Sequence, residues 1–93
     1  MVDTLTVVIE ADGNTEEITL PAGLIERLAE PGTPAVEVVA DVALMSFAGR
    51  AHALRHHGHG EPDEELDAIE ADVMDRFEER FGLTYAEATG HSH

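Results

Sequence analysis

A long apolar stretch in the middle of the chain constrains the fold more than any other feature. Between residues 36 and 48 only three side chains are polar, namely Glu37, Asp41 and Ser46. Pro34 stands just before this stretch, and proline is well suited to the first position of a helix. Gly58 and Gly60 follow it and favour a helix end. The pattern predicts a long central helix over residues 34–57 that is apolar around its whole circumference.

A helix that is apolar on all sides must be covered on all sides. The rest of so short a chain offers little surface for this purpose. We therefore expect a second copy of the chain to pack against the central helix across a two-fold axis, as in the commonest soluble oligomers. The predicted dimer interface consists of Val38, Val42 and Met45. The alternative is a monomer in which the other two predicted helices enclose the central one.

The N-terminal residues 4–20 have the pattern of a β-hairpin. Apolar and more polar side chains alternate, which is the period of a half-buried strand. The turn can be type I′ at Asp12-Gly13 or type II′ at Gly13-Asn14. Either turn gathers the same apolar side chains on one face: Leu5, Val7, Ile9, Ile18 and Leu20. A lone hairpin is marginal in water, so this face is expected to lie on helices.

Two further helices complete the predicted architecture. A short apolar stripe favours a helix over residues 22–30, and residues 62–81 are amphipathic. The apolar stripe of the second consists of Leu66, Ile69, Val73, Phe77 and Phe81. A capping-box pattern that begins at Thr84 predicts one last short turn in the tail, residues 84–93. The sequence thus predicts a single α+β domain over residues 1–93, with an N-terminal hairpin followed by a short, a long central and an amphipathic C-terminal helix.

The charge balance excludes several classes of partner. The chain carries twenty Asp and Glu, five arginines and no lysine, for a formal net charge of −15. Such a field repels phosphate, and no basic patch can displace counterions, so neither nucleic acid nor an anionic membrane is an expected partner. No apolar run reaches the ~18 residues of a membrane span. We expect a cytoplasmic protein.

The lysine-free acidic composition resembles that of proteins from extreme halophiles. Over its full length the chain is similar to the small, acidic, uncharacterised proteins of haloarchaea. This resemblance implies a solvent of molar salt, in which the Debye length falls to about 3 Å and neighbouring carboxylates hardly repel one another. It implies no activity.

A weaker, local resemblance covers residues 17–47. A strand, the segment LPAGLIERLAE, a glycine-containing turn and a second helix opening TPAVEVVADVAL are similar to ribbon-helix-helix regulators. The resemblance implies a dimer whose strands read DNA through polar and basic side chains. Here the solvent positions of the strand are Glu17 and Thr19, which disfavour contact with phosphates. A transcriptional regulator of this kind is therefore an alternative interpretation.

Histidines at the end of the central helix form the one pattern that suggests metal chemistry. His52 and His56 are four residues apart, so they share a helix face, as two imidazole ligands require. His59 could supply a third ligand to Zn²⁺ or Ni²⁺. Arg55 stands beside the pair and would oppose a dication. The alternative is a solvated helix end, where histidines interact favourably with the negative end of the helix dipole.

No catalytic grouping is evident. The two serines, Ser46 and Ser92, lie outside any nucleophile-elbow pattern, and there is no phosphate loop or dinucleotide fingerprint. Enzyme activity and a bound cofactor are not expected. The leading interpretation is a non-enzymatic, homodimeric interaction or regulatory module, and a histidine-based metal-binding protein is the main alternative.

The composition yields one prediction about solvent. Removing salt should loosen or unfold the chain, because carboxylates that are screened in molar salt repel one another when the Debye length grows. The thermal midpoint measured by circular dichroism should rise between low and molar salt. A midpoint that does not change would contradict the halophilic interpretation.

Overall fold

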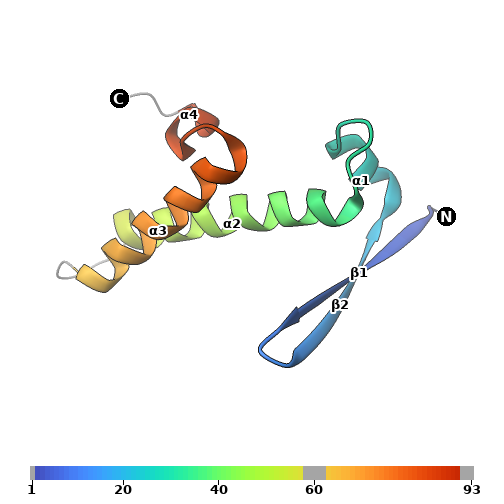
Figure 1. The fold of residues 1–93 in the computed structure, drawn as a ribbon, viewed down its shortest axis with the longest axis horizontal. Helices are drawn as coiled ribbons and strands as arrows, with labels where there is room; N and C mark the ends of the chain where they lie inside the picture. Colours follow the sequence, from blue (N-terminus) through green and yellow to red (C-terminus); the bar gives the residue numbers. More distant parts are fainter. Residues whose placement is uncertain (1, 58–62, 91–93) are drawn as a thin grey trace. The chain divides into compact units, whose positions relative to one another are not determined.

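The computed structural model describes residues 2–57 and 63–90. Within them an antiparallel hairpin precedes the helices (Figure 1), and the elements are β1 (Thr4–Ala11), β2 (Asn14–Pro21), α1 (Ala22–Leu28), α2 (Ala35–His57), α3 (Glu64–Phe81) and α4 (Tyr85–Thr89). The predicted α+β class is confirmed. In this part of the chain no helix is long and apolar enough to cross a membrane.

The chain divides into two compact units, Met1–Asp41 and Val42–His93. The first contains the hairpin, α1 and the first turns of α2. The second contains the remainder of α2 together with α3 and α4. The single domain expected from the sequence stays a prediction.

The hairpin has the predicted pairing of faces. Asp12 and Gly13 have φ values of 52° and 80°, so both central residues of the turn are left-handed, as a type I′ turn requires. The resulting register pairs Val7 with Ile18 and puts the five predicted apolar side chains on one face. Of the two turns that the sequence allowed, the Asp-Gly turn is the one that forms.

Helix α1 packs on this hairpin. Ile25 of α1 and Val7 of β1 are both buried. The backbone N–H of Ala22 donates to the carbonyl of Asp3 at 2.9 Å, which fixes the start of α1 beside the first strand. The helix ends at Leu28, two residues earlier than predicted. The expected helical cover is therefore only partial, since Ile9 and Ile18 on the same face are 47% and 38% exposed.

Helix α2 forms over nearly all of the predicted range, but only part of its surface is covered. Ala48 is fully buried and Ala51 nearly so, whereas Phe47 and Leu54 are each 62% exposed. Within the second unit, the side chains of Phe47 and Leu54 therefore remain in contact with solvent.

The three residues of the predicted dimer interface have different exposures. Val38 is only 4% exposed, so its side chain has almost no surface left for a partner. Val42 and Met45 are 51% and 48% exposed. The predicted interface is thus available at two of its three positions, and burial within the chain explains the third.

The second unit is organised around Phe77 of α3, which is fully buried. Its ring lies 4.5 Å from that of Phe81 and 5.5 Å from that of Tyr85, measured between centroids. The edge-on contact with Tyr85 joins α4 to α3. Tyr85 also approaches α2 closely, since a Cβ on Gly49 would lie 3.2 Å from its hydroxyl oxygen.

Both ends of α3 are fixed by local signals. Asp63 Oδ1 accepts hydrogen bonds from the backbone N–H groups of Glu65 at 3.0 Å and Leu66 at 3.2 Å. Gly82, with φ of 77°, ends the helix in the left-handed conformation, and its N–H donates to the carbonyl of Glu78. These caps fix the residues at which α3 begins and ends.

The predicted capping box at Thr84 is confirmed. The N–H of Glu87 donates to Thr84 Oγ1 at 3.1 Å, and the N–H of Thr84 donates to Glu87 Oε1 at 2.9 Å. The hydrogen bonds from Thr84, the backbone one first, lower the pKa of Glu87 below its ordinary value of 4.5. Because the folded pKa is the lower one, the box stabilises α4 above the unfolded pKa and weakens as the pH falls through the folded pKa.

Replacing the N-cap of α3 should destabilise the second unit. Asp63→Ala removes the oxygen that accepts two backbone N–H groups, which should lower the free energy of unfolding by about 1 kcal/mol. Asp63→Asn keeps an accepting oxygen and should lose only the smaller charge–dipole contribution of about 0.3 kcal/mol. Urea unfolding of both variants measures the difference, and an alanine variant as stable as the parent would show that the cap is unimportant.

Candidate metal centre

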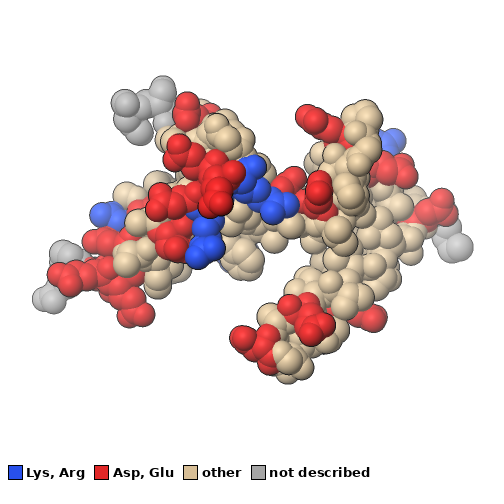
Figure 2. Space-filling model, viewed as in Figure 1, with Lys and Arg blue, Asp and Glu red and all other residues tan. Residues whose placement is uncertain are grey.

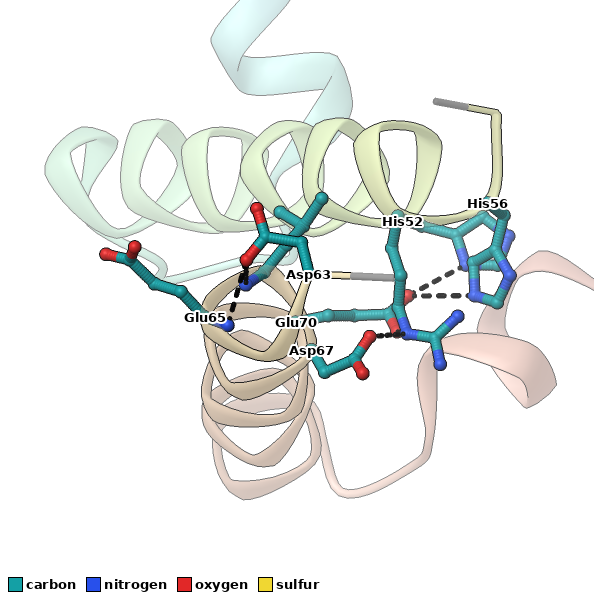
Figure 3. A network of polar contacts seen from close by, with 8 residues as sticks. His52, His56, Asp63, Glu65, Asp67 and Glu70 are labelled. Atoms are coloured by element: carbon teal, nitrogen blue, oxygen red, sulfur yellow. Dashed lines mark hydrogen bonds and ion pairs between the residues drawn. The ribbon is translucent and has the colours of Figure 1, made fainter. Parts of the chain in front are cut away.

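Two helices bring the central residues of the candidate centre together. One turn of α2 separates His52 from His56, so both imidazoles lie on the same face of that helix. Glu70 of α3 lies opposite them (Figure 3). Its Oε2 atom is 3.2 Å from His52 Nδ1 and 3.2 Å from His56 Nε2. Both imidazoles therefore converge on a single carboxylate oxygen.

The position of Glu70 on α3 explains why it faces inward. Glu70 follows Leu66 by four residues and precedes Val73 by three, so it lies within the apolar stripe of the helix. Its side chain is 15% exposed, compared with 41% and 43% for those of His52 and His56. A carboxylate withdrawn from water in this way needs partners, and α2 supplies them.

Arg55 contacts the other oxygen of the same carboxylate. Its Nε lies 3.2 Å from Glu70 Oε1 and 2.7 Å from Asp67 Oδ1. The guanidinium thus lies between two carboxylates, and its charge is compensated locally. The sequence suggested that Arg55 would oppose a dication, but in the structure it orients Glu70 so that Oε2 faces the imidazoles, as hydrogen-bonding partners of metal ligands commonly do.

The separations suit a small metal ion. One ligand atom from each of His52, His56 and Glu70 can be chosen so that all three lie within 4.8 Å of one another. A tetrahedral ion bound at 2.0–2.1 Å requires donor atoms about 3.3 Å apart. The two nitrogen–oxygen distances of 3.2 Å are close to that value. Without an ion, His52 Nδ1 and Glu70 Oε2 form a hydrogen bond, and His56 Nε2 lies at ion-pair distance from the same oxygen.

The structure brings together two of the three predicted ligands. His52 and His56 lie side by side, with ring centroids 4.3 Å apart. His59 lies outside the described residues. Glu70, which takes the third position in the structure, was not predicted, because the chain has too many carboxylates for one to stand out by composition. Its place within an otherwise apolar stripe is the signal that could have identified it.

A shallow hollow of about 300 Å³ adjoins the centre. His52 and Glu70 form part of its wall, and Met74, Thr84 and Tyr85 form much of the remainder. The ring of Tyr85 lies 5.7 Å from that of His52, measured between centroids. The capping box at the start of α4 therefore holds one wall of the hollow beside two of the candidate ligands.

The fold and the site define a small α+β protein with a candidate centre of two histidines and one glutamate between adjacent helices. The chain belongs to a family of unknown function (DUF7545), which it matches over residues 1–93. No curated protein and no solved structure matches it.

Proposed function

We propose that the protein binds a divalent transition-metal ion, Zn²⁺ in the first place, through His52, His56 and Glu70. The observation that carries this proposal is the convergence of three donor atoms from two helices within 4.8 Å. Two imidazoles and one carboxylate are a common ligand set for Zn²⁺, and imidazole also suits Ni²⁺. The nitrogen donors disfavour Mg²⁺ and Ca²⁺, which prefer oxygen.

Because the surface is acidic, specific metal binding at this centre must be distinguished from weak, nonspecific attraction of dications. Carboxylates are spread over the face shown in Figure 2, and a chain with a net charge of −15 attracts any dication weakly. Molar salt screens such diffuse attraction, because the Debye length is then only about 3 Å. Direct coordination by imidazole nitrogen does not depend on long-range attraction. Binding that persists in molar salt and in excess Mg²⁺ therefore identifies the centre.

Calorimetric titration of Zn²⁺ in molar salt with excess Mg²⁺ should show one ion per chain. The double variant His52→Ala, His56→Ala and the single variant Glu70→Gln should each weaken binding by more than about 100-fold, since the loss of a ligand should exceed the effect of losing an outer partner. Glu79→Gln removes the same charge from an exposed position of α3 and should leave the affinity unchanged. Equal weakening in Glu70→Gln and Glu79→Gln would show that only net charge matters.

His59→Ala separates the two possible ligand sets. An unchanged affinity is expected if His52, His56 and Glu70 form the set, whereas a loss as large as that of Glu70→Gln would make His59 a ligand as well. Far-UV circular dichroism of each variant checks that α2 and α3 remain folded.

A second candidate function is supported by the exposed apolar surface of α2. Phe47 and Leu54, together with Val42 and Met45, leave about half or more of their side chains in solvent. We propose that a second copy of the chain covers part of this surface, so that the protein is a non-enzymatic homodimeric module.

The alternative of a ribbon-helix-helix regulator has less support. The exposed strand positions Glu17 and Thr19 carry no positive charge, so this strand does not favour contact with DNA phosphates.

Sedimentation velocity in molar salt tests the dimer. The parent should be dimeric at micromolar concentration, and Met45→Asp should weaken association by at least about tenfold because it would bury an unpaired charge. Ala68→Asp adds the same charge at an exposed position of α3, outside the proposed interface, and should remain dimeric. A parent that sediments as a strict monomer would contradict this second proposal.

The composition supports a proposal about the cellular environment in which the protein would perform either role. We propose that the protein works in the cytoplasm of an extreme halophile, where high salt screens its carboxylates. The absence of lysine from the whole chain is the feature that supports this setting.

A further inference from the structure

We infer that a metal ion at this centre keeps one coordination position open, and that a water molecule or a small monodentate anion occupies it on the side of the hollow beside Tyr85. This inference rests on the proposed function and concerns what the same centre binds in addition to the ion. Three observations support this inference: the number of donor atoms in the cluster, the access of the centre to solvent, and the local charge.

The cluster offers three donor atoms, which is one fewer than a tetrahedral ion binds. Among the described residues the cluster comprises His52, His56 and Glu70 and offers one ligand atom from each. The carboxylate of Asp67 also belongs to this network, but its Oδ1 contacts Arg55 Nε at 2.7 Å and is not among the clustered ligand atoms. A tetrahedral ion takes four ligands, and sites with three protein ligands hold water or another exchangeable group in the fourth position.

Solvent can reach the side chains of the centre directly. The imidazoles of His52 and His56 are each about two-fifths exposed. His52 and Glu70 also reach the wall of the 300 Å³ hollow, which is large enough for several water molecules. An ion held by these residues is therefore within reach of a ligand that enters from the hollow.

Local charge determines which ligands fit. With neutral imidazoles, the carboxylates of Glu70 and Asp67 and the guanidinium of Arg55 leave a bound dication with one net positive charge, which a monoanion compensates. Asp75 and Glu78 form other parts of the hollow wall. Their carboxylates repel any anion that enters the hollow, and molar salt weakens this repulsion because the Debye length is then only about 3 Å. The open position should therefore accept water or one small monoanion.

Cobalt substitution tests the inference with azide as the probe. Co²⁺ should give visible absorption bands when it binds to the full chain, and azide should shift these bands in a saturable, one-to-one manner. The titration is run in molar sodium sulfate, because chloride would itself compete for the position. Glu70→Gln should lose the bands altogether.

The two proposals fail in different ways. If the parent chain shows no bands with Co²⁺, the proposed metal function is wrong. If the bands form but azide leaves them unchanged, metal binding stands and the open position is wrong. Should azide act on His59→Ala but not on the parent, His59 fills the fourth position and the inference is again overturned.

Discussion

The carboxylate of Glu70 is the group on which the arrangement of α2 and α3 depends. It occupies a place in the apolar stripe of α3 and is largely withdrawn from water. A carboxylate in such a place destabilises the fold unless it is paired. His52 and His56 contact one of its oxygens and Arg55 the other, all from the last turns of α2. The contacts that compensate this carboxylate between the helices are also the contacts that bring the candidate metal ligands together.

The remaining core of the second unit is small, so these polar contacts contribute a larger share of its stability. Among its described residues Phe77 and Ala48 are fully buried, and Tyr85 adds an aromatic contact to α4. Meanwhile Phe47 and Leu54 remain exposed on α2. A metal ion between the helices and a second copy of the chain over the apolar surface would each compensate for the limited core, and they would act on different parts of α2.

Much of the fold could be predicted from the sequence because its signals are local. The alternation of Leu5, Val7 and Ile9, the Asp12-Gly13 turn and the capping box at Thr84 each specify a short segment, and the structure has all of them. The candidate site could be predicted only in part. The spacing of His52 and His56 is a property of one helix, whereas the approach of Glu70 depends on how α3 lies against α2. No pattern within one element encodes that contact.

The coordination of an added zinc ion decides whether His52, His56 and Glu70 form a metal centre. X-ray absorption at the zinc edge, recorded on the full chain in molar salt, reports the atoms that surround the ion. The account predicts a first shell of nitrogen and oxygen at about 2.0–2.1 Å with the outer-shell scattering of two imidazoles. A shell of oxygen atoms alone, without imidazole scattering, would mean that the ion is held by surface carboxylates and would contradict it.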